Sequence, residues 1–524
     1  MDFLVHHLVR TNATRRPEKE ALVHGDSRLS YGDVAVQIAG LADGLRRAGV
    51  ARGDRVGIYL DASVAQALSI FAVSQAGGVF VPINGLLLAE QVAHIAHDCT
   101  MKVLITTGAR LTSLSAVLKD LPSLQGLVVI DDGTLLDVQI PTLDFDECRR
   151  RRSTSEIGDL GIEKDLAAIL YTSGSTGKPK GVMLSHGQIL AGASIVSTYL
   201  SITEADRILA VLPFSFDAGL NQIMTAFQHG GTCVLINFLF GRDIVDALRR
   251  ERVTGLAGVP TLWSLLAQPS STLARTALPH LRYITNTGGA MPQTVLKQLR
   301  EALPSTRIFL MYGLTEAFRS TYLPPEELDR RPTSMGKAIP DTEILVVNEH
   351  GRPCRPGEIG ELVHRGPTVS LGYWGRPDLT AEVLRPHPFL PPELASEEKV
   401  CYSGDLVRMD EDGFLYFVGR RDAMIKSSGF RISATEVEEA LYQSGLLKGA
   451  AVIGLPDEVL GQSIKAFVVA RDGEQVRPDE LTAYCASRLP RYMVPAAVEV
   501  VDDLPKTTSG KVDYPALRRR EGLA

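Results

Sequence analysis

The sequence predicts an α/β protein built from a large N-terminal domain and a smaller α+β domain near the C-terminus. Residues 30–240 alternate helix-like and strand-like patterns, which is typical of mostly parallel sheets covered by helices. Residues 340–418 are richer in Gly and Pro and predict a small antiparallel sheet or barrel. The chain has 524 residues, more than one hydrophobic core usually serves, so we expect at least two domains.

The first alternations can be followed in the hydrophobic pattern. Apolar side chains recur three and four positions apart from Val34 to Ala48, as on one face of a helix. Val56, Ile58 and Leu60 then alternate with other residues, as in a strand. Short β-rich runs between helical segments follow at 79–83, 103–106, 127–130 and 166–170. This order predicts parallel strands that are joined by helices.

Two local signals define later elements. Residues 410–413 (DEDG) separate two strand-like runs and predict a hairpin. Ser433 and Glu436 form a capping-box pattern, so a helix is expected to begin at Ala434. Strand-like runs follow at 451–455 and 464–470. Together they predict a compact C-terminal domain of about 100 residues.

Composition and charge exclude several classes of function. The net charge is −6, so no basic field would attract nucleic acid or an anionic membrane. Residues 149–152 are four arginines, which we interpret as a solvated loop because no aromatic residues are interleaved for base stacking. The six cysteines show no CxxC spacing, which favours free thiols in a reducing compartment. No signal-peptide core or long apolar run is present, so we expect a cytoplasmic protein without a membrane span.

The segment Tyr171–Gly181 (YTSGSTGKPKG) is the most informative part of the chain. It follows a strand-like run, and the six small residues Thr172–Gly177 leave the backbone free to wrap an anion with N–H groups and hydroxyls. Lys178 and Lys180 add positive charge. Pro179 argues against a Walker A loop, because it occupies the position of the Mg²⁺-binding hydroxyl. A flexible surface turn is the alternative, but a linker would not need two lysines beside its glycines.

The full segment YTSGSTGKPKGV resembles the signature of the adenylate-forming superfamily, which includes acyl-CoA synthetases, amino-acid adenylation domains and luciferases. Further segments resemble the family's YGxTE, [ST]GD, GRxD, KxxGxR and PxTxxGK motifs, in the same order. They are residues 312–316, 402–405, 419–422, 426–431 and 505–511. With LSYGD near residue 30 and AGGVFVPI near residue 80, the likeness covers nearly the whole chain. Ordered motifs over this length make the resemblance specific.

The resemblance implies an ATP site assembled from distant parts of the chain. Thr315 would donate to a phosphate and Glu316 would hold Mg²⁺, which neutralises charge where pyrophosphate leaves. Tyr312 resembles the adenine-stacking ring and Asp405 the carboxylate that accepts both ribose hydroxyls, although a core aromatic and a turn aspartate are the ordinary interpretations. The other implied nucleotide-binding residues are Thr172, Ser173, Gly174, Ser175, Thr176, Gly177, Lys178, Lys180, Gly288, Gly289, Ala290, Gly313 and Arg420.

Three further residues take their roles only from the resemblance. Lys511 would pair with the carboxylate and the α-phosphate while the acyl–phosphate bond forms, where an ammonium offsets growing negative charge. Outside the motif, such a lysine is ordinarily a solvated charge. Asp422 matches the hinge about which a mobile C-terminal domain swings, and Gly429 resembles the glycine beside the path of the thiol. The expected division is an AMP-binding and acyl-substrate domain at 1–418, a hinge at 419–422 and a C-terminal cap domain at 423–524.

The acyl pocket is expected between the phosphate loop and the YGLTE motif. The run FSFDA resembles the amino-acid-activating branch, in which Asp217 binds the substrate ammonium, whereas many fatty and aryl acyl-CoA synthetases carry a His-containing run there. Alternatively, Asp217 pairs with a protein group such as Arg319 or caps a helix that starts near Ala218. Arg319 would hold a second carboxylate, as in an acidic or β-amino acid. The remaining implied pocket residues are Asn221, Gly258, Thr285, Thr287, Met311 and Ser320.

These observations predict an ATP- and Mg²⁺-dependent acid:thiol ligase. It would activate a small amino or other polar acid as acyl-AMP, release pyrophosphate and pass the acyl group to a phosphopantetheine thiol. No carrier-protein domain follows Lys511, so the thiol is expected from free CoA or a separate carrier protein. A fatty or aryl acyl-CoA synthetase is the alternative enzyme. A non-catalytic nucleotide-binding relative is less favoured, because Glu316, Asp405 and Lys511 are all present.

Overall fold

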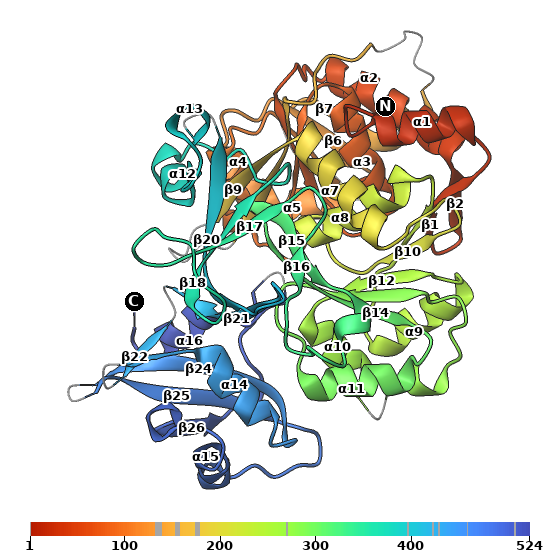
Figure 1. The fold of residues 1–524 in the computed structure, drawn as a ribbon. Coiled ribbons are helices and arrows are strands. Elements are labelled where there is room, and N and C mark those ends of the chain that lie inside the picture. Colours follow the sequence, from red (N-terminus) through yellow and green to blue (C-terminus); the bar gives the residue numbers. More distant parts are fainter. Residues whose placement is uncertain are drawn as a thin grey trace.

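The N-terminal part contains two large sheets, coloured from red to green in Figure 1. The first has the strand order β7-β6-β5-β3-β4-β8-β9. The computed structural model describes residues 2–131, 139–151, 158–172, 179–268, 271–395, 398–421, 424–427, 430–457, 460–507 and 510–523. All strand pairs in this sheet are parallel except β8 with β9. Its strands are β3 (Arg55–Tyr59), β4 (Val79–Pro82), β5 (Val103–Thr107), β6 (Gly126–Ile130), β7 (Thr142–Asp144), β8 (Leu166–Thr172) and β9 (Lys180–Ser185). The strands predicted near 56, 79, 103, 127 and 166 are therefore confirmed.

The second sheet has the order β16-β15-β14-β13-β12-β10-β11-β1-β2. The strands from β14 to β1 in this order run parallel, and antiparallel pairs close both edges. The strands are β1 (Glu20–His24), β2 (Ser27–Ser30), β10 (Arg207–Ala210), β11 (Thr232–Leu235), β12 (Gly255–Gly258), β13 (Tyr283–Asn286), β14 (Arg307–Leu314), β15 (Ala317–Leu323) and β16 (Lys337–Ala338). A parallel centre of this kind places the loops after its strands along one edge.

Four helices join the two sheets through a common core: α2 (Tyr31–Arg47), α3 (Val64–Gln75), α7 (His186–Tyr199) and α8 (Asp217–Gln228). Val34, Leu68, Ile189 and Ile223, one from each helix, belong to one buried cluster with residues of both sheets. Helix α3 is buried all round from Gln66 to Ser74, as expected for a helix enclosed by other layers. This core fixes the two sheets relative to each other.

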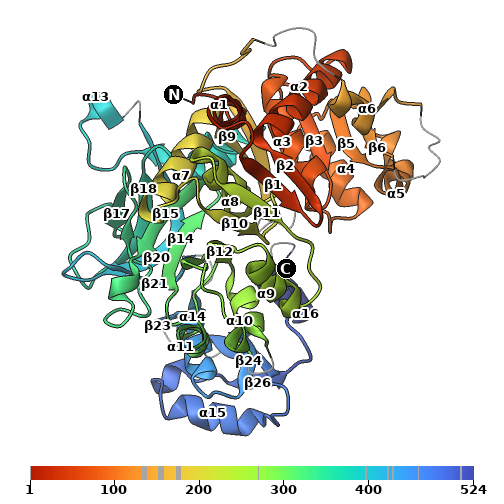
Figure 2. The ribbon, with the colours of Figure 1, turned by 90° about the vertical axis from the view of Figure 1, so that its right-hand side faces the viewer.

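The remaining helices of the N-terminal part are α1 (His7–Arg15), α4 (Ala89–Asp98), α5 (Gly108–Leu118), α6 (Phe145–Arg150), α9 (Gly241–Arg250), α10 (Pro260–Leu266), α11 (Gln293–Ala302), α12 (Pro377–Val383) and α13 (Pro392–Ala395). Among them, α4, α5 and α6 lie beside the first sheet and α9, α10 and α11 beside the second (Figure 2), whereas α1 packs against α2 and α8. Short 3₁₀ turns occur at Leu273–Arg275, Pro325–Glu327 and Arg491–Met493.

A five-stranded antiparallel sheet follows, as the Gly- and Pro-rich segment predicts. Its strands are β17 (Glu343–Val347), β18 (Ile359–Arg365), β19 (Leu384–Pro386), β20 (Lys399–Met409) and β21 (Leu415–Arg420). The predicted hairpin joins β20 to β21. Asp410 Oδ1 accepts from the N–H groups of Asp412 and Phe414, and Gly413 has φ +82°, which glycine adopts without steric cost.

The C-terminal part forms its own α+β layer, shown in blue in Figure 1. Strands β24 (Leu447–Asp457), β25 (Gly461–Ala470) and β26 (Ala497–Val500) form one sheet, and β22 (Ile425–Ser427) pairs with β23 (Phe430–Ile432). Helices α14 (Ala434–Tyr442), α15 (Pro478–Ala486) and α16 (Tyr514–Arg520) accompany them. Helix α14 begins at Ala434 as predicted, because Ser433 Oγ accepts from the N–H of Glu436 at 3.3 Å.

Two sequence expectations concern the whole chain. All six cysteines are free thiols, and all but Cys354 are buried. Among the described residues, no helix is both long enough and apolar enough to span a bilayer.

Candidate active site

Three parallel strands end side by side at the edge where many predicted site residues lie. Gly258 on β12 is in register with Asn286 on β13, which is in register with Leu310 on β14. The next residues, Thr287 and Met311, therefore follow at the same edge. The carboxyl ends of parallel strands are the usual location of ligand sites in open α/β sheets.

Tyr312 extends from this edge to the five-stranded sheet. Its hydroxyl donates to Asp405 Oδ2, and Arg420 Nη1 lies 2.9 Å from Asp405 Oδ1. Asp405 and Arg420 are register partners on β20 and β21, and Asp405 is only 6% exposed. Burial and the charge of Asp405 raise the pKa of Tyr312, so its phenol remains a donor. The structure thus brings three predicted nucleotide-binding residues together.

His364 on β18 is a neighbour of this cluster that the sequence did not suggest. Its ring stacks on Tyr312 with centroids 5.9 Å apart and an interplanar angle of 16°. Neither ring nitrogen has a hydrogen-bond partner among the described residues, and burial lowers the pKa of His364 to about 3. The imidazole is therefore neutral. No flanking signal marks it, because only the fold brings β18 against Tyr312.

Thr315 and Glu316 form the two-residue turn between β14 and β15. Tyr373 donates its hydroxyl to Glu316 Oε1 at 2.5 Å, and Lys180 Nζ lies 5.4 Å from the centroid of the Tyr373 ring. The other oxygen of Glu316 has no protein partner among the described residues. Tyr373 therefore connects the carboxylate predicted to hold Mg²⁺ with one end of the predicted phosphate loop. Its sequence context gave no sign of this contact.

Lys511 lies beside the loop that follows β13, although the two are far apart in the sequence. A Cβ built on Gly288 would lie 3.0 Å from Lys511 Cε and 3.6 Å from its Nζ, and Gly288 has φ +79°. The next loop residues, Gly289 and Ala290, are exposed, and Asn286 Nδ2 donates to Gly289 O at 2.8 Å. Lys511 itself is exposed and has no carboxylate partner among the described residues. The C-terminal domain therefore presents this ammonium to the loop predicted to line adenine.

Arg319 lies in an irregularity of the β14–β15 hairpin. The register shifts between the Tyr312–Thr321 and Leu314–Ala317 pairs, and Arg319 adopts φ +61°. Its backbone packs so closely on Gly313 that a Cβ there would lie 2.8 Å from Arg319 N. The residue is 4% exposed, and its Nη1 donates to Thr287 Oγ1 at 2.8 Å. Two predicted pocket residues, Arg319 and Thr287, are thus in direct contact.

Asp217 is the first residue of α8, and Phe216 occupies the N-cap position. Neither alternative interpretation of Asp217 holds. The N-cap is Phe216 and not Asp217, and among the described residues the Asp217 carboxylate forms no ion pair, since Arg319 donates to Thr287 instead. Asn221 lies one turn further along the same helix face, and its Oδ1 is buried without a partner. Ser215 Oγ, just before the helix, is likewise buried and unpaired.

The other predicted pocket residues are buried on neighbouring strands. Met311 Sδ accepts from the Tyr199 hydroxyl at 3.5 Å, and Ser320 Oγ donates to Ala317 O at 3.1 Å. A Cβ on Gly258 would lie 2.7 Å from the indole of Trp263, so the glycine allows that ring to pack on the strand. Thr285 on β13 is 2% exposed.

Several predicted residues lie outside the described part of the chain. They are Ser173, Gly174, Ser175, Thr176, Gly177, Lys178, Asp422 and Gly429. The ends of the phosphate loop are described. Thr172 and Lys180 are register partners at the ends of β8 and β9, so the predicted loop connects two antiparallel strands.

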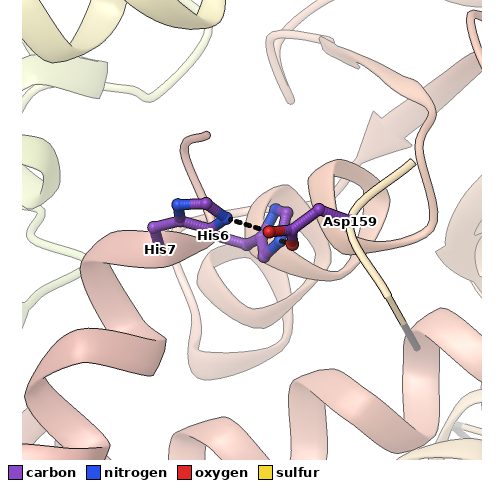
Figure 3. Close-up of side chains that lie close together, drawn as sticks. All are labelled: His6, His7 and Asp159. Carbon is purple, nitrogen blue, oxygen red and sulfur yellow. Dashed lines mark hydrogen bonds and ion pairs between the residues drawn. The ribbon is translucent and has the colours of Figure 1, made fainter. Parts of the chain in front are cut away.

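A separate cluster of potential metal ligands occurs at the N-terminus. His6 Nε2 and His7 Nε2 lie 3.1 and 3.0 Å from the two carboxylate oxygens of Asp159 (Figure 3). Arg10 Nη1 also lies 2.8 Å from Asp159 Oδ1, and Arg10 Nη2 lies 2.7 Å from His7 Nε2. The guanidinium already supplies positive charge to these ligand atoms. We therefore interpret the cluster as a structural contact that holds the start of helix α1 against Asp159.

Comparison with known families identifies the chain. The family described as AMP-binding enzyme matches residues 9–374, and the AMP-binding enzyme C-terminal domain matches residues 436–511. The chain belongs to the AMP-binding enzyme family. These AMP-binding enzymes are AMP-forming acyl-CoA synthetases and adenylation enzymes, so the resemblance given by the sequence motifs is confirmed.

Individual relatives resemble this AMP-binding enzyme along its whole length. A feruloyl-CoA synthase from Amycolatopsis sp is 35% identical, covering 97% of each chain. An L-proline–[L-prolyl-carrier protein] ligase from Streptomyces coelicolor is 32% identical, covering 99% of this chain and 96% of its own. The structure of the anthranilate CoA ligase AuaEII in complex with anthranoyl-AMP has a TM-score of 0.88 at 27% identity, covering 99% and 97% of the two chains. An o-succinylbenzoate coenzyme A synthetase from Bacillus subtilis, solved with ATP and magnesium ion, has a TM-score of 0.81 at 27% identity, covering 96% and 98%.

Proposed function

We propose that this AMP-binding enzyme activates a small polar carboxylic acid with ATP and transfers the acyl group to a phosphopantetheine thiol. The observation that supports this most strongly is that Lys511 lies beside the Gly288 loop, next to strand β14, which carries Tyr312 and leads into the turn at Thr315. An ammonium at that point would pair with the acid carboxylate and the α-phosphate as they approach. Offsetting the growing negative charge lowers the barrier to acyl-AMP formation.

The nucleotide would be held by residues from three sheets. Asp405 would accept the ribose hydroxyls, with Arg420 beside it, and Tyr312 would provide the face for adenine. Because Gly288 lacks a side chain, Lys511 can approach the loop proposed to line adenine without crowding. The phosphates would lie against the loop between Thr172 and Lys180, as proposed from the sequence.

Glu316 fits a magnesium site, because one of its oxygens is fixed by Tyr373 and the other has no protein partner among the described residues. When bound, Mg²⁺ would neutralise charge on the phosphates where pyrophosphate leaves. Tyr373 would orient the carboxylate, and Thr315 would donate its hydroxyl to a phosphate oxygen. Glu316 is therefore the residue that we assign to the metal.

An amine on the acid is supported by the contacts of Asp217. A carboxylate without a protein cation at a helix N-terminus can accept an ammonium, and the unpaired Asn221 and Ser215 oxygens nearby can accept further hydrogen bonds. A second candidate is an aryl acid. It is favoured by the likeness to feruloyl-CoA synthase and anthranilate CoA ligase, and by the stacked Tyr199–Tyr322 pair near Met311, with ring centroids 4.3 Å apart.

For the second half-reaction we propose rotation of the C-terminal domain about residues 419–422, with Asp422 as the hinge and Gly429 beside the thiol. The acceptor would be CoA or a separate carrier protein. Relatives named for each acceptor are similarly close to this chain.

A pyrophosphate-exchange screen tests the proposed function. Amino, β-amino, dicarboxylic, aryl and fatty acids would each be assayed, and every active acid would then be offered CoA and a phosphopantetheinylated carrier protein. Exchange with small polar acids, followed by thioester formation, is expected. Exchange only with medium or long fatty acids would contradict the assigned substrate class, and ATP binding without any exchange would contradict the ligase assignment.

A further inference from the structure

Arg319 is a buried guanidinium that no described residue neutralises. Only 4% of the residue is exposed, no carboxylate lies within ion-pair distance among the described residues, and Nε has no hydrogen-bond partner. Within the part of the chain that the structure describes, its one side-chain hydrogen bond goes to the neutral hydroxyl of Thr287. A buried charge in this situation is destabilising unless an anion joins it.

Two partly buried arginines of this chain show the usual arrangement. Arg331, with a side chain 10% exposed, contacts Glu327, Asp410 and Asp412. Arg207, with a side chain 19% exposed, pairs with Glu20 and Glu251. Each of these guanidinium groups is paired with at least two carboxylates. The lack of a carboxylate partner among the described residues is therefore a local feature of Arg319.

The backbone at Arg319 is unusual as well. A non-glycine residue at φ +61° is strained, and the register shift redirects its side chain from the regular strand alternation. Strained backbone conformations cluster at active sites and ligand clamps, and β-bulges are over-represented next to active sites. Here they place the guanidinium against Thr287, one residue before the Gly288 loop.

The position of Arg319 separates it from the groups that would handle the reacting atoms. Lys511 contacts the exposed loop at Gly288, and Glu316 lies at the hairpin turn. Arg319 lies inside, close enough to Tyr199 of α7 that its charge opposes the rise that burial causes in the pKa of Tyr199. An anionic group of the substrate that reaches Arg319 would therefore belong to the part of the acid that lies deepest in the protein, away from the reacting carboxylate. The planar guanidinium suits a carboxylate, which can accept from Nε and an Nη together.

We propose that Arg319 binds a second carboxylate of the acid, so that the preferred substrate is a small dicarboxylic acid or acidic amino acid. This inference rests on the proposed function and names the substrate class of the same site. The hydroxyl of Thr287 fixes one edge of the guanidinium and leaves Nε for the substrate.

Matched acid and amide pairs test the proposal by pyrophosphate exchange: succinate with succinamate, aspartate with asparagine, and glutamate with glutamine. We expect the wild-type enzyme to prefer at least one diacid over its monoamide by about 100-fold or more in kcat/KM. Arg319→Gln should lower kcat/KM about 100-fold for that diacid and change it less than about threefold for the monoamide. Arg319→Lys should recover part of the lost kcat/KM for the diacid, because lysine keeps the positive charge but lacks the planar guanidinium that donates two hydrogen bonds to a carboxylate.

Arg307→Gln is the matched control. Arg307 begins β14, the other strand of the hairpin that contains Arg319, but its side chain is half exposed and pairs with the exposed Glu326 at 3.0 Å. It should leave the selectivity unchanged. Equal losses for diacid and monoamide in Arg319→Gln would show that the guanidinium serves the reacting groups, and would overturn the proposal.

The range of acids that the wild-type enzyme accepts in pyrophosphate exchange is an independent test, because it does not require any variant to fold. Exchange restricted to acids with a single carboxylate would overturn the assignment of Arg319 while leaving the ligase function intact. Failure of every acid would remove the proposed function and this inference with it.

Discussion

At the scale of single residues, the candidate site depends on where one exposed ammonium lies. Lys511 follows Gly510, whose φ is +79°, and its carbonyl oxygen accepts from the Thr507 N–H at 2.7 Å. Gly510 lies close to helix α10, since a Cβ on it would be 3.7 Å from Thr261 Oγ1. The lysine is thus presented to the Gly288 loop by a defined backbone and not by a free tail.

Replacing Lys511 by Ala should separate the two half-reactions. Acyl-AMP formation should fall by about 100-fold or more, because an ammonium aimed at developing charge contributes on that scale. Transfer from preformed acyl-AMP to the thiol should fall less than about fivefold. Pyrophosphate exchange and single-turnover thioester formation measure the two steps.

Lys506→Ala provides the control for Lys511→Ala. It removes a lysine from the same segment, but one that pairs with Asp503 at 2.9 Å, so both steps should keep their rates. Equal losses in both half-reactions of Lys511→Ala would contradict the role assigned to Lys511.

At the scale of elements, the β14–β15 hairpin organises much of the site. It carries Tyr312 before the turn, Thr315 and Glu316 at the turn, and Arg319 after it. Tyr373 ties this hairpin to the rest of the protein, because its hydroxyl bonds Glu316 and its backbone pairs with Val182 of β9. A single tyrosine therefore couples the hairpin turn to the strand that leaves the phosphate loop.

Tyr373→Phe should weaken the response to magnesium more than binding of the acid. The ring remains for Lys180, but Glu316 loses the donor that orients it, and loss of such a partner typically reduces metal affinity 10- to 100-fold. The Mg²⁺ concentration for half-maximal exchange should rise about tenfold. Tyr416→Phe, which removes a comparable bond to Asp410 at 3.1 Å on β21, should leave that concentration unchanged. An unchanged Mg²⁺ dependence in Tyr373→Phe would exclude the coupling.

Helix α14 contains a buried acid whose titration should be visible in stability. Burial raises the pKa of Glu438 to about 7, although its Oε1 accepts from Tyr514 at 2.7 Å and from Val452 N–H at 2.8 Å. The unfolded chain releases this proton near pH 4.5, whereas the folded chain holds it until about pH 7. The contribution to stability is therefore complete below pH 4.5 and is lost as the pH rises through 7, at roughly 1 kcal/mol per pH unit.

Glu438→Gln should remove this dependence while keeping an oxygen for both donors. Thermal midpoints of the two proteins should agree near pH 4.5, and the variant should become progressively more stable than the wild type toward pH 7.5. A constant difference across that range would show that Glu438 does not titrate as described.

At the scale of the whole molecule, buried histidines link stability to pH in the opposite direction. Burial lowers the pKa of His6 and His364 to about 3 and of His186 to about 4. These rings anchor the N-terminal segment and the interior of the five-stranded sheet, since Val5 N–H donates to His186 Nδ1 and His6 contacts Asp159. Neutral imidazoles therefore contribute to the packing of both the N-terminal segment and the five-stranded sheet.

Acid should therefore destabilise the fold below about pH 6.5. The unfolded chain binds these protons near pH 6.5, while the folded chain does so only near pH 3 to 4, so stability falls as the pH drops between those values. His364→Phe should flatten the decline in thermal midpoint between pH 6.5 and 4.5 by about one third of the histidine contribution. His350→Gln, at an exposed turn, should follow the wild-type curve. Parallel curves for His364→Phe and the wild type would contradict the neutral, buried imidazole.

The sequence by itself determined the α/β alternation, the β20–β21 hairpin, the start of α14 and the family, because each is encoded by neighbouring residues: apolar spacing, a glycine in a turn, a capping serine, a contiguous motif. Only the tertiary structure decided which distant residues meet. The contacts of Tyr373 with Glu316, of His364 with Tyr312 and of Lys511 with the Gly288 loop join different elements, and no local pattern specifies them. The unpaired charge of Arg319 could be recognised only in the fold, because whether a charge is neutralised depends on what packs around it.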